Sequence, residues 1–502
     1  MNKAWILVLT VLLFGSGRAE EGNAIRPIAL LNRLGALHHP VSTTNEMAQR
    51  FFNQGLTLIY SFNHDAAVRS FHRALKHDPN LAMAHWGIGL ALGPNINLPV
   101  TPEAEKAAYD ATQRALALRE HASGPERDYI DALATRYSIE PDADLKALDR
   151  AYSVAMGQLA KKYPDDTDAA TLYAESLMNL RPWELWDGEG QPAEGTLHIV
   201  DVFEEVLRRD PDHPGANHYY IHAVEASTRP ERALPSARRL ETYAPAAGHL
   251  VHMPSHIYMR TGEYASAARI NEIASEVDLD FLQVCGIQGI YPALYTSHNL
   301  HFAAVAHTLQ GKYGAARRYA ERVSGHVEPF AAVSLELETF LPTLEQVLVA
   351  FERWEDILAL PEPNEKFKLH RGVWHFARGM AFAATGETAK AEAEAAALAA
   401  LRESLPEGAQ FGPFNKAQAV FTVAEKQVAA RIGLARGEAA RAVGLLEEAL
   451  TVEDSLRYME PPDWYLYTRE ALGGALIASG KYEAAEQVFR QDLAKNHRKG
   501  RA

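Results

Sequence analysis

Residues 51–79 read FFNQGLTLIYSFNHDAAVRSFHRALKHDP. Apolar residues recur through this stretch at helical spacing, and almost nothing alternates with the period of a strand. In a frame of 34 residues that begins at Ala48, the eighth, twentieth, twenty-seventh and thirty-second places are taken by Gly55, Ala67, Ala74 and Pro79. Small residues at such places let two antiparallel helices approach closely, and the proline ends the second helix. The stretch therefore predicts a pair of packed helices.

The same spacing recurs along the chain, with further frames that begin at Ala82, Pro214, Gly248, Ser297, Gly372, Val423 and Leu466. In this spacing, residues from about 45 to 496 resemble the tetratricopeptide-repeat family. The resemblance implies an all-α fold, a right-handed α-solenoid of antiparallel helix pairs whose first helices line a concave groove. A globular helical bundle is the alternative fold.

Four phrases narrow the resemblance: NHYYIHAVEAS (217–227), GHLVHMPSHIYMRTGEY (248–264), SHNLHF (297–302) and EDSLRYMEPPDWYLYTREALG (453–473). Together they are similar to a broad group of secreted bacterial tetratricopeptide proteins. This narrower resemblance implies a fold and no particular activity, so that function has to be inferred from the residues.

Composition excludes several classes of protein. Hydrophobic residues make up 47% of the 502 residues and charged residues 23%, which is ordinary for a folded chain. The 64 acidic residues outnumber the 50 basic ones and give a net charge of −14, which argues against nucleic acid or an anionic membrane as a partner. With one cysteine, Cys285, the chain has no disulfide framework, all-cysteine zinc site or iron–sulfur cluster.

The first residues, MNKAWILVLTVLLFGSGRA, predict a signal peptide at 1–19, with a basic start, an apolar run and a small-residue ending. The mature protein is then expected to be periplasmic or secreted and to have no membrane span after cleavage; an uncleaved anchor is the alternative. The rest of the chain is predicted to comprise a lead-in at 20–44, repeats at 45–165, His-rich repeats at 166–330, repeats at 331–496 and a tail at 497–502.

Nine of the 21 histidines lie between residues 213 and 307, and they are arranged in stripes. At 100° per residue, His218, His222 and Glu225 fall within a narrow sector of one helix. The same holds for His249, His252 and His256 on a second helix, and for His298 and His301 on a third. The family resemblance implies that these are groove positions, and an approximate frame from Thr167 adds Glu175.

Imidazoles that converge from neighbouring helices, with carboxylates nearby, predict a transition-metal site. The predicted ligands are His218, His222, His249, His252, His256, His298 and His301. Packed helices are 8–10 Å apart, so one ion does not easily collect ligands from all three, and a two-metal cluster centred on the second helix fits better. So many imidazoles argue against magnesium and calcium and leave copper, zinc, iron or manganese.

Three functions remain open at this stage. The first is a metal-dependent hydrolase or oxidoreductase that uses Glu225 and Glu175 as general bases or additional ligands. The second is a metal-binding protein without catalysis. The third is a non-catalytic repeat scaffold that binds a peptide, a protein or a small molecule in its groove. A metal-free cluster of histidines that senses pH or relays protons is a further alternative to the metal site.

Overall fold

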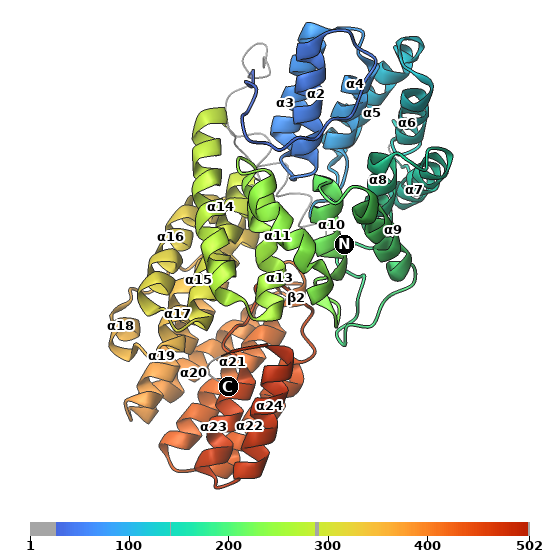
Figure 1. Ribbon diagram of the computed structural model, residues 1–502. Coiled ribbons are helices and arrows are strands. Elements are labelled where there is room, and N and C mark those ends of the chain that lie inside the picture. The colour runs from blue at the N-terminus through green and yellow to red at the C-terminus, as the bar shows by residue number, and fades with distance from the viewer. Residues whose placement is uncertain (1–26, 141, 287–290, 500–502) are drawn as a thin grey trace. The chain divides into compact units, whose positions relative to one another are not determined.

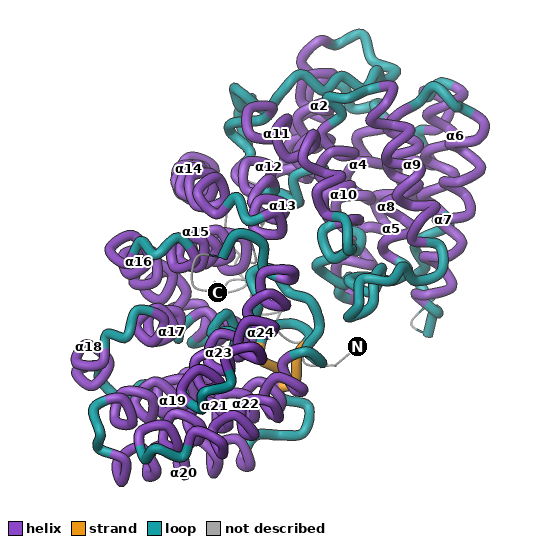
Figure 2. The backbone as a smooth tube through the Cα atoms, turned by 60° about the horizontal axis from the view of Figure 1, so that its bottom comes forward, coloured by secondary structure: helices purple, strands orange, loops and turns teal. Residues whose placement is uncertain are grey.

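A computed structural model of the chain describes residues 27–140, 142–286 and 291–499 (Figure 1). The predicted signal peptide at 1–19 lies outside these residues. Nearly all regular structure among them is helical, and the only paired strands described, β1 (Gln410–Phe411) and β2 (Asn415–Lys416), form one short antiparallel ribbon (Figure 2). The predicted all-α fold of antiparallel helix pairs is confirmed.

The chain divides into two compact units. The first comprises the described residues up to Ile257 together with Ile273–Pro292, and the second comprises Tyr258–Glu272 with the residues from Ala293 onward. This division differs from the three repeat blocks predicted from the sequence, which remain a prediction.

The helices up to the first boundary are α2 (Glu46–Ile59), α3 (His64–His77), α4 (Ala82–Leu92), α5 (Pro102–Ala117), η1 (Arg119–His121), α6 (Gly124–Ala134), α7 (Leu145–Lys162), α8 (Thr167–Asn179), α9 (Thr196–Arg209), α10 (Pro214–Val224), η2 (Pro230–Ala233), α11 (Leu234–Tyr243) and α12 (Gly248–His252). The boundaries between the units fall within α13 (Pro254–Thr261), α14 (Tyr264–Cys285) and η3 (Tyr291–Thr296).

The remaining helices belong to the second unit. They are α15 (Ser297–Leu309), α16 (Tyr313–Ala331), η4 (Leu335–Phe340), α17 (Thr343–Ala350), α18 (Trp354–Ala359), α19 (Lys368–Ala384), α20 (Thr388–Ser404), α21 (Ala417–Ala435), α22 (Ala439–Glu453), α23 (Thr468–Ala478) and α24 (Tyr482–Lys495).

Close packing of consecutive helices explains the small residues of the repeat. The buried ring of Phe71 on α3 lies where side chains at Gly55 on α2 and Gly87 on α4 would project, since a Cβ at either glycine would be about 2.5–2.6 Å from the ring. Ala67 and Ala74 on the same helix are fully buried. The helices α10, α12 and α15 begin at Pro214, Gly248 and Ser297, which are the positions at which three of the sequence frames begin.

The segment before α2, residues 27–44, forms no helix and is held by side-chain amides. Gln54 accepts a hydrogen bond from the backbone N–H of Leu31 (2.7 Å) and donates one to the carbonyl of Ala29 (3.0 Å). Gln49 holds the backbone of residues 39–41 in the same way, at 2.8 and 3.0 Å. Each glutamine side chain therefore forms hydrogen bonds to the backbone of an extended segment of this chain.

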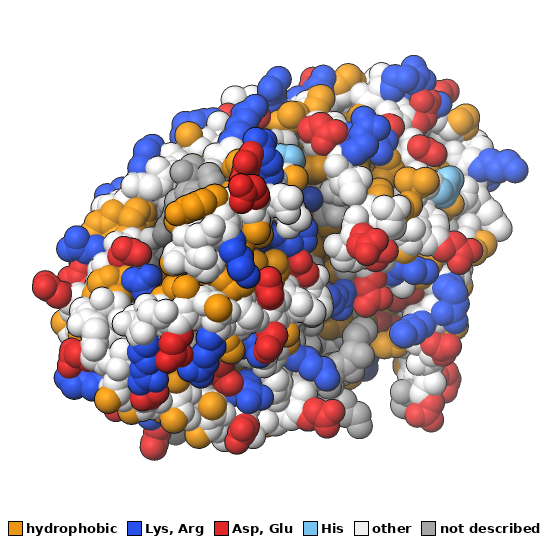
Figure 3. Space-filling model, turned by 90° about the horizontal axis from the view of Figure 1, so that it is seen from below, with side chains coloured by type: hydrophobic (Ala, Val, Ile, Leu, Met, Phe, Trp, Pro, Cys, Tyr) orange, Lys and Arg blue, Asp and Glu red, His pale blue; other side chains and the backbone are white. Residues whose placement is uncertain are grey.

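Acidic and basic side chains are interspersed over the face that Figure 3 shows, and histidine is scarce on it. Within the described ranges, no helix has the length and apolar character needed to cross a membrane.

Candidate metal centre

Five of the predicted ligands come together in the first unit. His218 and His222 lie on α10, His249 and His252 on α12, and His256 on α13. They are at most 7% exposed, so they are buried rather than lining an open groove as the repeat frame predicted.

The local sequence explains why three short helices meet here. Pro214 begins α10, where the fixed φ of proline suits the first turn. Gly248 begins α12 against the side chain of Asp278, which leaves no room for a Cβ. Pro254 begins α13 directly after α12, because proline cannot continue the hydrogen bonding of the preceding helix.

Two aromatic residues cover the histidines. The ring centre of Phe62, from the turn after α2, lies 4.6 Å from that of His218 and 5.3 Å from that of His249. Trp183 packs edge-on against His222 at 5.5 Å. Both have positive φ, 54° and 58°, which is uncommon for bulky residues and is concentrated at functional sites. Strained backbone in two separate loops therefore closes the site.

Ring nitrogens face one another within the cluster. The Nε2 atoms of His218 and His249 are 3.1 Å apart, and those of His252 and His256 are 2.9 Å apart. One ring nitrogen from each of His218, His222 and His249 lies within 4.8 Å of the other two. Two lone pairs repel at such distances, so each close pair needs one shared proton or one metal ion between its members.

The opposite ring nitrogens of three of these histidines are fixed by acceptors. Glu225, directly after α10, accepts hydrogen bonds from the Nδ1 atoms of His222 and His256, each at 2.6 Å. The carbonyl of Tyr60 accepts one from Nδ1 of His218 at 2.7 Å. Protons on these Nδ1 atoms place the lone pair of each of these rings on Nε2. This is the arrangement in which metal-binding histidines are usually oriented by an acceptor behind the ring.

The short contacts of Glu225 are hydrogen bonds rather than metal-ligand spacings. Two ligands at right angles on an ion with bonds of about 2.05 Å are about 2.9 Å apart, and tetrahedral ligands are farther apart. The 2.6 Å contacts are shorter than either separation. Glu225 is fully buried and both of its oxygens accept hydrogen bonds, so it is placed to orient two imidazoles. Its role as a general base or additional ligand stays a prediction.

The protonation states agree with this arrangement. Burial lowers the pKa of His218 and His249 well below the usual range, with a further contribution from neighbouring histidines. Burial also lowers the pKa of His222, although Glu225 opposes the shift. Burial alone would raise the pKa of Glu225, but His256 and His222 outweigh it and hold that pKa below its usual range. His218, His222 and His249 are thus neutral imidazoles beside the carboxylate of Glu225.

Glu175 has a different set of hydrogen-bond partners. It lies on α8, where it accepts a hydrogen bond from Asn179 at 2.5 Å, and it lines a small cleft with Arg136 and His64. Its Oε2 atom is buried and has no hydrogen-bond partner among the described residues. Burial raises the pKa of this carboxyl to about 7, against the opposing effects of Arg136 and Asn179.

The raised pKa of Glu175 predicts a stability difference that depends on pH. The folded chain keeps this proton up to about pH 7, whereas an unfolded chain loses it near 4.5, so stability falls as pH rises through that window. Glu175→Gln removes this loss of stability, because glutamine does not ionise. Relative to the native chain, the free energy of unfolding of the variant should increase by about 2 kcal/mol more at pH 8 than at pH 5.

Urea unfolding of both chains at the two pH values measures this difference, with the exposed Glu194→Gln variant as the control. A difference between Glu175→Gln and the native chain that stays constant from pH 5 to 8 would contradict the assignment of a buried, protonated carboxyl.

The two remaining predicted ligands, His298 and His301, lie on α15 in the second unit. The ring of His298 meets Phe302 at 4.8 Å, and that of His301 meets Phe340 at 5.5 Å. Burial lowers the pKa of His301 to about 4, so it is a neutral imidazole. Their participation in the metal centre stays a prediction.

The residues that surround the proposed ligands could not be recognised from the sequence. Tyr60 acts through a backbone carbonyl, which leaves no signal in the sequence. Phe62 and Trp183 belong to turns that follow α2 and α8, and the spacing of the histidines does not indicate either residue. Their roles follow from the tertiary structure.

Comparisons with known proteins agree with the class that these helix pairs define, an all-α repeat protein. Residues 468–502 match a family model described as a tetratricopeptide repeat. The chain therefore contains a tetratricopeptide repeat at residues 468–502, as predicted for that region; membership of the narrower bacterial group stays a prediction. No curated protein matches its sequence significantly.

Solved structures show weak similarity along most of the chain. A human IFIT1 dimer with m7Gppp-AAAA is 12% identical, with 90% of this chain and 95% of that chain covered and a TM-score of 0.35. Yeast Tom70 is 13% identical, with 91% and 93% covered and a TM-score of 0.30. The P58(IPK) TPR domain is 12% identical, with 90% and 94% covered and a TM-score of 0.25. The fold assignment rests on the helix pairs and on the matched repeat.

Proposed function

We propose that the first unit of this protein binds a transition-metal ion through His218, His222 and His249, and that His252 and His256 form a second pair beside them. The observation that carries the proposal is the pairing of Nε2 atoms at 3.1 and 2.9 Å while Glu225 and the carbonyl of Tyr60 hold Nδ1 protons behind the rings. An ion between the Nε2 atoms satisfies several of these lone pairs at once.

The donor set narrows the choice of metal. Imidazole nitrogen suits copper, zinc and iron, whereas manganese favours carboxylate and water ligands. Since both oxygens of Glu225 accept hydrogen bonds from histidines, the first unit offers mainly nitrogen. We therefore favour copper, zinc or iron over manganese within the range that the sequence left open.

Burial favours a metal-holding role over catalysis. A catalytic metal keeps a coordination position open to substrate, while structural sites are closed. Phe62 and Trp183 cover the rings, so turnover as a hydrolase or oxidoreductase requires one of these aromatic residues to move. Catalysis remains the less favoured form of the proposal.

A peptide-binding scaffold is the second candidate, and the repeat at 468–502 favours it. In the first unit, the amides of Gln49 and Gln54, which suit the backbone of an extended peptide, already hold residues of this chain. The scaffold alternative therefore applies best to the second unit, and it is compatible with a metal in the first.

Elemental analysis of the purified protein, followed by thermal unfolding with and without a chelator, tests the proposal. We expect one or two transition-metal ions per chain. We also expect a metal-dependent gain in the free energy of unfolding of about 2.7 kcal/mol when free metal exceeds the Kd 100-fold. The metal proposal is contradicted if the chain takes up no zinc, copper or iron and if a chelator does not change its melting temperature. The peptide-binding scaffold would then be the remaining candidate.

We further propose that the protein is exported, on the basis of residues 1–19. Fractionation of cells that express the full chain should then place the protein outside the cytoplasm, with a mature N-terminus near residue 20. Recovery of the uncleaved chain in the cytoplasm would contradict export.

A further inference from the structure

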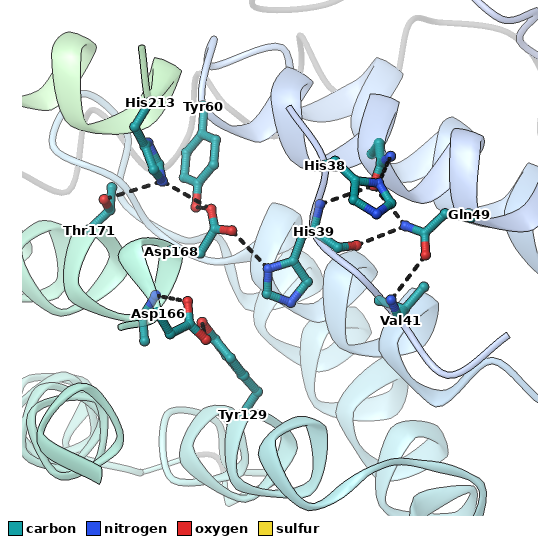
Figure 4. A network of polar contacts seen from close by, with 12 residues as sticks. His38, His39, Val41, Gln49, Tyr60, Tyr129, Asp166, Asp168, Thr171 and His213 are labelled. Atoms are coloured by element: carbon teal, nitrogen blue, oxygen red, sulfur yellow. Dashed lines mark hydrogen bonds and ion pairs between the residues drawn. The ribbon is translucent and has the colours of Figure 1, made fainter. Parts of the chain in front are cut away.

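The first unit contains a second polar network (Figure 4), which is linked to the proposed metal centre through Tyr60. Its centre is Asp168 on α8, which is 7% exposed. One carboxylate oxygen accepts hydrogen bonds from the hydroxyl of Tyr60 at 2.5 Å and from Nε2 of His213 at 3.1 Å. The other accepts one from Nδ1 of His39 at 2.8 Å. One buried carboxylate thus joins three separate segments.

Two of these three donors support helix α10, which carries His218 and His222. Tyr60 binds Asp168 through its hydroxyl and His218 through its carbonyl, at 2.7 Å. His213 caps α10, since its Nδ1 accepts the backbone N–H of Ala216 at 3.1 Å. The carboxylate of Asp168 therefore helps to fix both the position of the helix and the orientation of one ligand.

The third donor belongs to the N-terminal segment, residues 27–44. His39 is buried in this segment, and Gln49 holds its carbonyl at 2.8 Å (Figure 4). Its ring packs edge-on against Tyr129. Asp168 is thus the point at which the N-terminal segment meets the support of α10.

Protonation states keep this network in one arrangement. Burial alone would raise the pKa of Asp168, but hydrogen bonds from His213 and His39 outweigh it and lower that pKa, so the group is a carboxylate. Burial, reinforced by Asp168, raises the pKa of Tyr60 well above its usual range, so its hydroxyl keeps the proton that it donates.

The carboxylate oxygens around His39 are engaged in hydrogen bonds within the protein. Asp166 lies near His39 and Asp168, but one of its oxygens caps α8 at the N–H of Ala169 and the other accepts the hydroxyl of Tyr129, each at 2.9 Å. The oxygens of Asp168 are also engaged. The network is therefore structural support, and what it supports is α10.

We propose that Asp168 is a positioning residue that couples the N-terminal segment to the metal centre. The proposal rests on metal binding by the first unit, as proposed above. Because coupling is reciprocal, attachment of the segment strengthens metal binding, and bound metal strengthens attachment of the segment.

Titration of the full chain with Co²⁺, followed by visible absorption, tests the first half. In Asp168→Asn, an NH₂ group replaces one carboxylate oxygen. This group cannot accept the hydrogen bonds that the replaced oxygen accepts. We expect the Co²⁺ affinity to fall about tenfold, as for other residues behind metal ligands. Asp166→Asn is the matched control, because asparagine also caps helices well, and its affinity should equal that of the native chain.

Two further variants keep the test decisive if Asp168→Asn does not fold. His39→Ala should weaken Co²⁺ binding, and His39→Asn, whose amide nitrogen replaces Nδ1 as a donor, should restore it. If His39→Ala weakened Co²⁺ binding only through lost packing, His39→Asn would not restore it.

Hydrogen exchange of residues 28–43 tests the second half. Co²⁺ should slow exchange in the native chain and in Asp166→Asn, but not in Asp168→Asn or His39→Ala. If the native chain binds Co²⁺ and these variants bind it equally well with the same exchange, the coupling is overturned while metal binding stands. If the native chain itself binds no Co²⁺, zinc or copper, the proposed function fails first.

Discussion

Replacement of His218 with alanine is expected to weaken metal binding more than about 100-fold, beyond the effect of losing an outer-shell partner. His218 is fully buried, and its Nε2 lies 3.1 Å from that of His249 while its Nδ1 is held by Tyr60. Without this ring the proposed site loses one of three ligands, and no other side chain is expected to replace it. Helix α10 should persist, because alanine is the best helix former.

Competition titrations with a chromophoric chelator, together with metal content per chain, measure the loss for His218→Ala. The matched control is His307→Ala in the second unit. His307 is also a buried histidine, 5% exposed, with its Nε2 bound to Glu272 at 2.8 Å. We expect this control to lose about 1–3 kcal/mol of stability and to keep its metal. Equal metal content in both variants would mean that the His cluster serves only packing.

The helix pairs could be predicted from the sequence because small residues recur at fixed positions of the repeat. Gly55 leaves space for the ring of Phe71 on the next helix, and a larger residue would collide with it. The histidine stripes were equally readable, because spacings of three and four place side chains on one side of a helix. The convergence of five histidines in one unit follows from the same regularity.

Burial of the site could not be predicted, because loops from distant parts of the chain produce it. Phe62 follows α2 and Trp183 follows α8, and no periodicity connects either of them with α10. The immediate partners of Glu175 are likewise not readable from the repeat frame, because Asn179 and the cleft that it shares with Arg136 and Phe62 come from the tertiary structure. Its role at the site stays a prediction.

Replacement of Glu225 with glutamine is expected to weaken metal binding by about 10- to 100-fold, although the side chain keeps its size. The carboxylate accepts two Nδ1–H groups, from His222 and His256, at 2.6 Å. A glutamine oxygen accepts only one of them, and its NH₂ group faces the other donor. One imidazole must then leave its proton unpaired or move it to Nε2, the atom proposed to bind metal. We also expect the metal-free chain to lose about 1–3 kcal/mol of stability.

The matched control for Glu225→Gln is Glu204→Gln on α9. Glu204 also accepts two hydrogen bonds, each at 2.6 Å, but its side chain is partly exposed and its donors are Tyr220 and Arg232 rather than histidines. This variant should change stability by less than about 1 kcal/mol and bind metal as the native chain does. The diagnostic result is ¹⁵N NMR of the imidazoles: in Glu225→Gln, one of His222 and His256 should show a proton on Nε2. Native tautomers with native metal affinity would mean that Glu225 does not orient the ligands, since the carboxylate acts here only through the position of those two protons.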